Sequence, residues 1–311
     1  MGFIGSGGRG RAIWDRLRAF ADVEVRGGWL ARSAPEAEVP NGKGLPRLDS
    51  AEALLLQVDA LVIAVPVEER FVFAQLALRQ QLPCWVEAPI ACTPEQMRRS
   101  VALVEEARVS LKPGHTLLFH PVVWALRERW QAPQLLEVRQ EVALHPRRAP
   151  VDVASELLYP NLALLLGLVS SPVHRLEATA VCVSGLAPEP DGFRVHLRFE
   201  NGLEAQLWVS RLSPEAVHEL RLYQTGQVAR ADLIRNTLEW TRLHPRAEPG
   251  GLNLLYERPR LSEADALSAS LGAFLEAVRR NQDPPVSVYD AALVYQVFRN
   301  TLEKSRVHGA P

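Results

Sequence analysis

The residues with the clearest chemical meaning form a glycine loop near the start of the chain. Gly5, Gly7 and Gly10 have the spacing Gly-x-Gly-x-x-Gly, between an apolar run at residues 1–4 and a helical pattern. In that setting the glycines permit a tight turn, close approach to a diphosphate, and packing of the helix on the strand. The unpaired amides at the helix start then face the phosphates. We predict a dinucleotide site at Gly5, Ser6, Gly7 and Gly10; the alternative is a glycine-rich turn that has lost its ligand.

The second predicted strand, residues 23–30, bears on the choice of cofactor. An acidic residue about 20 positions beyond the loop normally binds the ribose 2′-hydroxyl of NAD. Here the strand runs instead into Arg32 and Ser33. Arg32 can pair with a 2′-phosphate and stack on adenine, and Ser33 can donate a hydrogen bond to it. The pattern favours NADP(H), with NAD(H) as the alternative, unless Arg32 is only a solvated surface side chain.

Strand and helix patterns alternate through the first half of the chain. Further strands are predicted at residues 60–65, 84–87 and 116–119. Helices are predicted at residues 51–57 and 68–80, and from Thr93, where a cap precedes a proline and an acid. This alternation is typical of a parallel, doubly wound sheet. We therefore expect residues 1–121 to form an N-terminal Rossmann domain that binds the dinucleotide.

The second half has a different pattern. Successive strands are predicted at residues 174–184, 193–199, 203–211 and 218–224, with a hairpin turn at residues 200–202. Amphipathic helices are predicted at residues 262–280 and 289–306. We expect residues 122–311 to form a second α/β domain with an open, mainly antiparallel sheet.

Composition narrows the class of protein. The 311 residues carry a formal net charge of −1, so no overall field attracts nucleic acid. The best apolar run, residues 162–169, is much shorter than the ~20 residues that span a bilayer. The cysteines form no C-x-x-C pair, the histidines form no i, i+4 pair for zinc, and the first residues have no secretory pattern. We expect a cytoplasmic protein without a metal, nucleic-acid or membrane partner.

Two further segments complete a family pattern. Residues 59–66 read Asp-Ala-Leu-Val-Ile-Ala-Val-Pro, and residues 85–93 read Trp-Val-Glu-Ala-Pro-Ile-Ala-Cys-Thr. With the glycine loop, they resemble the glucose-fructose oxidoreductase and inositol dehydrogenase family (Gfo/Idh/MocA). The resemblance implies hydride transfer between a nicotinamide and a small carbonyl or hydroxyl substrate, with Pro66 and Glu87 beside the cofactor. It also implies a homo-oligomer formed through the C-terminal sheet, and a C-terminal helix that packs on the first domain.

The chain differs from this family at the positions of its catalytic residues. Members usually have Glu-Lys-Pro after the fifth strand, and the lysine helps hold the substrate and move its proton. Here the segment is Glu87-Ala88-Pro89, and alanine neither donates a proton nor carries charge. Members that act on sugars or polyols also place an Asp and a His one helical turn apart, toward the nicotinamide. The matching residues here are Leu157 and Asn161.

Three side chains are left as candidates for catalysis. His120 follows the predicted strand at residues 116–119, and an unperturbed imidazole titrates near neutral pH. Tyr159 can donate a phenolic proton, and Asn161 can hold a substrate without moving its proton. The alternatives are structural: a histidine in a turn, an aromatic ring packed beside Pro160, and a helix cap.

Three functions remain open. The first is an oxidoreductase with an altered catalytic centre, since the cofactor itself carries the hydride chemistry. The second is a reductase similar to the biliverdin reductases, which resemble the same family and lack the usual lysine arrangement. The third is a non-catalytic sensor or subunit that binds a dinucleotide or another ligand. Oxidation of NADPH with a carbonyl or tetrapyrrole substrate separates the enzymes from the sensor.

Overall fold

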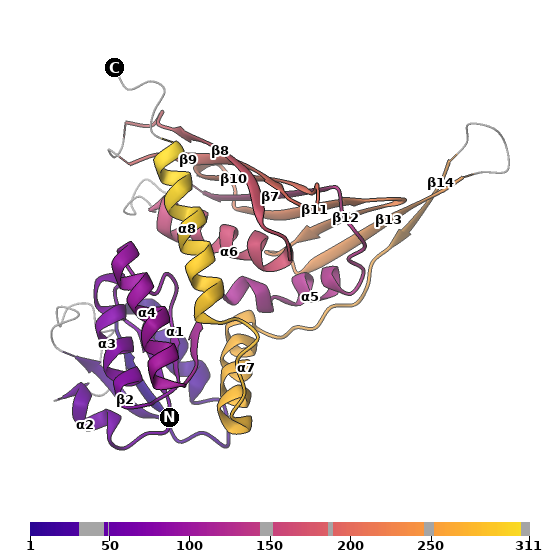
Figure 1. The fold of residues 1–311 in the computed structure, drawn as a ribbon. Helices are drawn as coiled ribbons and strands as arrows, with labels where there is room; N and C mark the ends of the chain where they lie inside the picture. Colours follow the sequence, from indigo (N-terminus) through magenta and orange to yellow (C-terminus); the bar gives the residue numbers. More distant parts are fainter. Residues whose placement is uncertain (31–46, 49, 144–151, 186–188, 246–251, 306–311) are drawn as a thin grey trace. The chain divides into compact units, whose positions relative to one another are not determined.

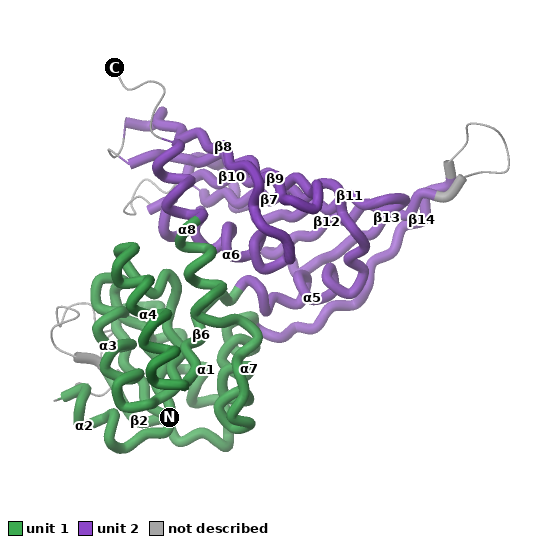
Figure 2. The backbone as a smooth tube through the Cα atoms, viewed as in Figure 1, with its two compact units in different colours: residues 1–116, 266–296 green, residues 117–265, 297–311 purple. Residues whose placement is uncertain are grey.

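The chain divides into two compact units (Figure 2). Unit 1 comprises residues 1–116 and 266–296, and unit 2 comprises residues 117–265 and 297–311. The computed structural model describes residues 1–30, 47–48, 50–143, 152–185, 189–245 and 252–305. Unit 1 therefore combines an N-terminal segment with a segment from the C-terminal part of the chain.

Unit 1 contains a six-stranded sheet in the order β3-β2-β1-β4-β5-β6, and all of its pairs are parallel. The strands are β1 Gly2–Gly5, β2 Arg26–Leu30, β3 Arg47–Leu48, β4 Leu61–Ala64, β5 Cys84–Val86 and β6 Leu111–Pro113. The strand order reverses beside β1, which confirms the predicted doubly wound Rossmann sheet. In such sheets the ligand lies at the carboxyl ends of the strands, where the order reverses.

Helices connect these strands (Figure 1). They are α1 Gly7–Leu17, α2 Ala51–Leu55, α3 Val67–Arg79 and α4 Pro94–Ala107. The side chain of Ser50 accepts a hydrogen bond from Ala53 N at the start of α2, and Thr93 accepts one from Gln96 N at the start of α4. These caps explain why both helices begin where they do.

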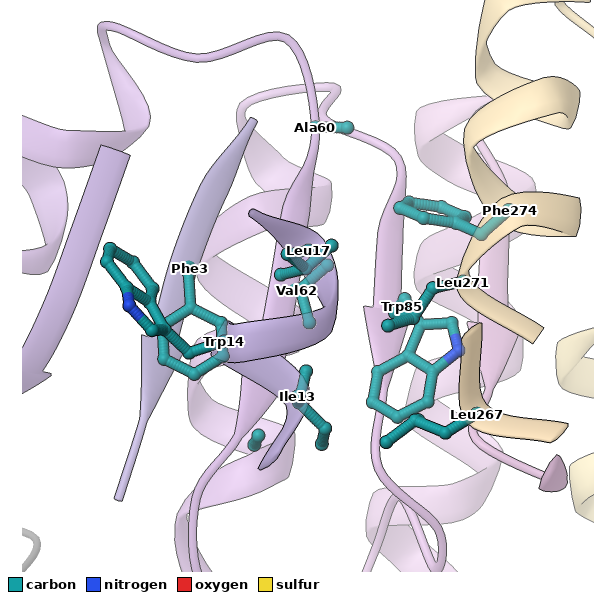
Figure 3. Close-up of a cluster of buried hydrophobic side chains, with 11 residues drawn as sticks. Phe3, Ile13, Trp14, Leu17, Ala60, Val62, Trp85, Leu267, Leu271 and Phe274 are labelled. Atoms are coloured by element: carbon teal, nitrogen blue, oxygen red, sulfur yellow. The ribbon is translucent and has the colours of Figure 1, made fainter. Parts of the chain in front are cut away.

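A helix from the C-terminal part of the chain completes unit 1. Helix α7, Ala266–Arg280, packs against α1. Its inner face carries Leu271 and Phe274, which lie in one cluster with Trp85 of β5 and Phe3 of β1 (Figure 3). These four side chains are fully buried. The core beneath the glycine loop therefore depends on residues near both ends of the sequence.

Unit 2 is built on an eight-stranded sheet in the order β14-β13-β12-β11-β7-β10-β9-β8. The strands are β7 Leu135–Ala143, β8 Val173–Val181, β9 Gly192–Phe199, β10 Glu204–Ser213, β11 Val217–Gln224, β12 Gln227–Asp232, β13 Thr237–Pro245 and β14 Leu252–Glu257. Only the β7–β10 pair is parallel among the described strands of this sheet, which confirms the mainly antiparallel prediction. Gly202 has φ +85° in the predicted hairpin turn between β9 and β10.

The helices of unit 2 lie along one face of this sheet (Figure 1). Helix α5, Pro121–Arg127, contacts β12 and β13, and a π-helical segment, Val153–Leu158, contacts β9 and β10. Helix α6, Tyr159–Leu168, continues directly from the π-helical segment. Helix α8, Val288–Lys304, begins in unit 1 and ends in unit 2.

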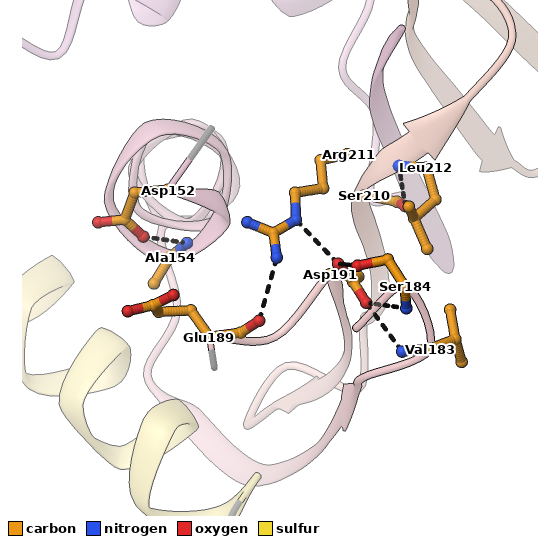
Figure 4. A network of polar contacts seen from close by, with 9 residues as sticks. All are labelled: Asp152, Ala154, Val183, Ser184, Glu189, Asp191, Ser210, Arg211 and Leu212. Atoms are coloured by element: carbon orange, nitrogen blue, oxygen red, sulfur yellow. Dashed lines mark hydrogen bonds and ion pairs between the residues drawn. The ribbon is translucent and has the colours of Figure 1, made fainter. Parts of the chain in front are cut away.

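A buried ion pair joins the segment before β9 to β10 (Figure 4). Arg211 Nε lies 2.9 Å from Asp191 Oδ1, and both side chains are almost fully buried. Burial opposes ionisation, but hydrogen bonds from Ser184, Val183 and Arg211 hold the pKa of Asp191 below its usual range. Both oxygens of the carboxylate therefore accept hydrogen bonds, and the buried ion pair connects two parts of the fold without needing a role in catalysis.

One predicted strand is wrong. Residues 116–119 form a 3₁₀ helix, and the sixth strand of unit 1 lies earlier, at Leu111–Pro113. A short apolar run does not distinguish a strand from a buried helical turn by periodicity alone. Here Thr116 N donates to Gly114 O, and His120 caps the helix that follows, so the chain turns instead of extending.

Candidate cofactor and substrate sites

The glycine loop joins β1 to α1 with close main-chain packing. A Cβ atom on Gly5 would lie 2.2 Å from the Phe3 ring, and one on Gly10 would lie 3.2 Å from Ala64 O. Gly7 has φ +62°, in the region that favours glycine. Each of the three predicted glycines therefore has a physical reason to be glycine, and the loop has the geometry expected of it.

The start of α1 is suited to an anion. Ser6 is the N-cap residue, but its side chain makes no capping hydrogen bond, and the first turn contains no acidic residue. A Cβ atom on Gly7 or Gly8 would have no neighbour within 4 Å, so space lies beside these residues. The first amides of a helix have no partner inside the helix. The loop therefore fits the diphosphate of a dinucleotide, which these amides would hold.

Two arginines surround the carboxylate of Glu87 at the end of β5. Arg9, in the glycine loop, donates through Nε to Glu87 Oε1, and Arg70 of α3 lies 3.3 Å from Glu87 Oε2. Arg70 also donates to Val65 O at 2.8 Å and to Pro89 O at 3.0 Å. Glu87 is only 8% exposed, and the two guanidinium groups compensate its buried negative charge.

Pro66 and Ala88 lie close in sequence to Arg70 and Glu87, respectively. Pro66 directly precedes α3, and its carbonyl accepts from Glu69 N at 3.0 Å. Ala88 follows Glu87, and its peptide bond to Pro89 is cis. The methyl side chain of Ala88 brings neither charge nor proton to the position of the family lysine. Arg32 and Ser33, the predicted 2′-phosphate ligands, lie outside the described residues.

Lys112 does not replace the missing lysine. It lies on β6, is fully buried, and donates to Ser270 Oγ of α7 at 3.1 Å. Burial lowers the pKa of Lys112 to about 7. The same burial, with the nearby Lys112, lowers the pKa of His115 to about 3. Lys112 therefore faces α7 inside the core of unit 1.

A polar cluster interrupts the apolar, helix-covered face of the sheet in unit 2. Asn161 of α6 is fully buried, and its Nδ2 donates both to Gln140 Oε1 of β7 and to Leu157 O, the latter at 2.7 Å. Asn161 Oδ1 lies 3.0 Å from His218 Nε2 of β11. Since both amide hydrogens are already donated, Oδ1 accepts and His218 Nε2 carries the hydrogen.

His120 lies near this cluster, at the start of α5. Its Nδ1 accepts from Val122 N at 3.3 Å, so it caps the helix. Burial lowers the pKa of His120, and burial followed by the charge of His120 lowers the pKa of His218 to about 4. Both rings are therefore neutral at pH 7. The fold brings two sequence candidates, His120 and Asn161, around His218, which the sequence analysis missed.

Tyr159 and Leu157 occupy apolar surroundings. Tyr159 is 1% exposed and packs edge-on against Phe298, with ring centroids 5.3 Å apart. Leu157, at the position of the family aspartate, is also buried. The only signal that marked His218 in the sequence was its inward position on a strand whose other inward residues include Leu220 and Leu222. Arg9 and Arg70 gave no comparable signal, because their partner is distant in sequence.

Comparisons with known proteins agree with this geometry. Residues 1–115 match the model of the Gfo/Idh/MocA oxidoreductase family with an NAD-binding Rossmann fold. A UDP-N-acetylglucosamine 3-dehydrogenase of Acidithiobacillus ferrooxidans is 27% identical over 278 residues, which are 89% of this chain and 88% of the relative. The resemblance inferred from the first-half motifs is therefore confirmed.

Solved structures support the fold over nearly the whole chain. A structure of UDP-N-acetylglucosamine 3-dehydrogenase from A. ferrooxidans superposes with a TM-score of 0.84 at 24% identity, covering 97% of this chain and 96% of the other. An oxidoreductase from Agrobacterium radiobacter in complex with NAD⁺, L-tartaric acid and magnesium gives 0.77 at 15% identity, covering 98% and 95%. These structures support the fold. The family match and the 27% identical dehydrogenase support an NAD(P)-dependent oxidoreductase in general terms.

Among the described residues, no helix combines the length and apolar character needed to cross a bilayer. The same residues hold no group of three or more histidine, cysteine or acidic side chains placed to bind a metal ion.

Proposed function

We propose that this oxidoreductase uses NADP(H) to interconvert a hydroxyl and a carbonyl group on a small substrate. The observation that carries the proposal is the uncapped start of α1, where space beside Gly7 and Gly8 meets amides that can bind a diphosphate. When bound, the nicotinamide supplies or accepts the hydride. The chain's own residues orient the two reactants and hold the substrate proton.

The preference for NADP(H) rests on Arg32 and Ser33. Arg32→Ala is expected to weaken NADPH by about tenfold and to leave NADH almost unchanged, because a charge-assisted bond to the 2′-phosphate is lost. Isothermal titration with each cofactor measures this difference. Arg26→Ala, which removes an exposed arginine paired with Glu24, is a matched control. Equal losses for both cofactors would remove the 2′-phosphate role of Arg32.

The substrate we propose to test first is a nucleotide-linked amino sugar. The support is the 27% identity to a UDP-N-acetylglucosamine 3-dehydrogenase across most of both chains. When a ring hydroxyl of such a sugar is oxidised to a ketone, the carbon that bears it gives up a hydride and the hydroxyl oxygen gives up a proton. Ala88 supplies no group for that proton, so another residue must take it.

The proton role falls to the residues of unit 2 that remain available. His120 is the first candidate to accept the proton. His218, which Asn161 orients, is the weaker base, because burial lowers its pKa to about 4. Tyr159 is the remaining candidate for the proton, with its ring in an apolar setting. His120→Asn is the informative variant, because its amide oxygen takes the place of Nδ1 and can still cap α5 but cannot exchange a proton at neutral pH.

A cofactor titration followed by a substrate panel tests the proposed function. NADPH should bind purified protein and raise its melting temperature, because ligand binding to the native state alone stabilises it. With NADP⁺, a UDP-linked amino sugar should produce absorbance at 340 nm. The panel also includes simple polyols and, with NADPH, biliverdin, which tests the biliverdin-reductase alternative.

A second candidate is a non-catalytic sensor that binds the dinucleotide. Ala88 favours it, because a chain that only binds needs no lysine at that position. Binding of NADPH without turnover of any substrate on the panel supports the sensor and contradicts the enzyme. Turnover of one substrate contradicts the sensor.

A further inference from the structure

We propose that Arg9 is a ligand of the cofactor diphosphate, and that Glu87 holds its guanidinium beside the loop while no dinucleotide is bound. The inference rests on the proposed dinucleotide site. It adds a side-chain ligand to a site otherwise made of main-chain amides, and it gives Glu87 a role in cofactor entry.

The position of Arg9 is the first support. Arg9 is the third residue of α1, between Gly8 and Gly10, in the turn whose amides face the expected diphosphate. Its side chain is 56% exposed, and its Nε bonds to a carboxylate 78 residues away in sequence. The next arginine on the helix, Arg11, bonds to Asp15 of the same helix at 3.0 Å. Of these two arginines, only Arg9 is held across the end of the sheet.

The strand order supports the location. The loop follows β1 and Glu87 follows β5, and in the sheet β4 lies between these two strands. The Arg9–Glu87 pair therefore crosses the carboxyl end of β4. A dinucleotide in a doubly wound sheet passes over this edge, beside the point where the strand order reverses. The pair thus occupies part of the path that the cofactor would take.

The charges show why Arg9 can leave Glu87. Arg70 contacts Glu87 at 3.3 Å and is 11% exposed, with main-chain bonds to Val65 and Pro89 that fix its guanidinium. It continues to compensate Glu87 after Arg9 has moved. The two arginines and one carboxylate together leave one net positive charge at the loop, which favours a diphosphate.

The energies also favour the exchange. Arg9 reaches the buried Glu87 from a side chain that is 56% exposed, so water and salt screen its half of the pair. A bidentate contact with a phosphate beside a helix N-terminus is stronger, since the helix dipole and the amides act on the same anion. Arg9 is therefore expected to prefer the diphosphate once it is present.

Two single variants should affect cofactor binding differently, one by lowering the affinity and the other by raising the association rate. Arg9→Gln is expected to weaken NADPH and NADH equally, by about tenfold, because both cofactors contain the diphosphate. Glu87→Gln releases Arg9, and it is expected to speed NADPH association by about two- to fivefold without weakening the final affinity. Titration calorimetry gives the affinities, and stopped-flow NADPH fluorescence gives the association rates.

Three further variants make the test specific. Arg11→Gln removes a charge from the same helix and should leave both cofactors within about twofold of wild type. Arg9→Lys keeps the charge and should recover part of the lost affinity. In the Arg9→Gln background, Glu87→Gln should no longer speed association, because its effect acts through Arg9. Thermal melts without cofactor establish that each variant is folded.

The outcomes separate this inference from the proposed function. Wild-type protein that binds neither cofactor overturns both. Wild-type binding that Arg9→Gln leaves unchanged overturns the role of Arg9 alone. If Glu87→Gln weakens binding as much as Arg9→Gln does, Glu87 is itself a cofactor ligand and the holding role is wrong.

Discussion

Gly7 is the residue at which occupation of the loop can be tested most directly. An indole introduced by Gly7→Trp would fill the open space beside α1, so the variant should bind NADPH at least tenfold more weakly. The positive φ adds backbone strain of ~1 kcal/mol, so the melting temperature should also fall slightly. Titration calorimetry and a thermal melt measure the two effects. Gly202→Ala, at a positive-φ turn of unit 2 with open space, is the control: it should lower the melting temperature slightly and leave NADPH affinity unchanged. Undiminished affinity in Gly7→Trp would show that the diphosphate does not bind at the loop.

Lys112 should make the stability of the protein depend on pH. Its folded pKa is about 7 and its ordinary value is 10.5, so between these values the unfolded chain binds a proton that the folded chain does not. The free energy of unfolding should therefore rise as the pH increases from 7 toward 10, by at most ~1.4 kcal/mol per pH unit. Lys112→Met removes this dependence and should stabilise the protein most near pH 7 and below.

Chemical denaturation at pH 7 and pH 9.5 tests this expectation. The wild type should gain stability between the two pH values relative to Lys112→Met. Lys304→Met is the control. Lys304 is the last residue of α8, is exposed, and donates to Leu176 O of β8. Parallel pH dependence in wild type and Lys112→Met would show that Lys112 stays protonated in the folded protein.

Single residues differ in how far the sequence predicts them. The glycine loop is predictable because its spacing reflects local main-chain geometry, and Ala88 is predictable as a departure because it lies inside a contiguous motif. The Arg9–Glu87 and His218–Asn161 contacts are not, because partners 78 and 57 residues apart meet only after the sheets have formed. Those contacts decide what the candidate sites can do.

At the scale of elements, α7 is the helix by which the C-terminal part of the chain contributes to the core of unit 1. Phe274 is fully buried among side chains of α1 and β5, including Leu17 and Trp85. Phe274→Ala should reduce the free energy of unfolding by about 3–5 kcal/mol, from lost burial and the cavity left behind. Denaturant melts measure this loss. Val72→Ala on α3 removes an exposed apolar side chain and should cost less than about 0.5 kcal/mol. Similar values for the two variants would contradict the packing of α7.

Elements were predicted best where their pattern is strong and local. The buried strand at residues 60–65 and the helix beginning at Thr93 appear within a few residues of their predicted positions. Residues 116–119 were assigned to the wrong element, because a short apolar run fits a buried turn as well as a strand. The strands β7, β12, β13 and β14 were missed. In β7 and β12 charged residues alternate along the strand, which weakens the hydrophobic signal.

At the scale of the whole molecule, the sequence order and the structural units do not coincide. The family match ends at residue 115, close to the end of the first segment of unit 1, but α7 and part of α8 also belong to that unit. The segment that completes unit 1 therefore follows the strands of unit 2 in the sequence. The sequence pattern predicts the first segment of unit 1, residues 1–116, but does not show that α7 and part of α8 belong to the same unit.

The face of the eight-stranded sheet opposite its helices is where we propose that a second copy of the chain binds. A groove on this face is lined by residues that include Glu137, Arg139, Glu219 and Arg221, with Trp208 beside them. Arginines and glutamates on neighbouring strands allow a two-fold related copy to pair opposite charges, and Trp208 offers an aromatic anchor.

Trp208→Ala should therefore weaken self-association by about thirtyfold, as expected for loss of a central aromatic contact worth ~2 kcal/mol. Sedimentation velocity over a range of concentrations measures the monomer–dimer equilibrium of the wild type and the variant. Arg98→Ala on α4 removes an exposed charge from unit 1 and should leave that equilibrium unchanged. A wild type that stays monomeric at all concentrations, or a variant that dimerises as well as the wild type, would exclude this face as the interface.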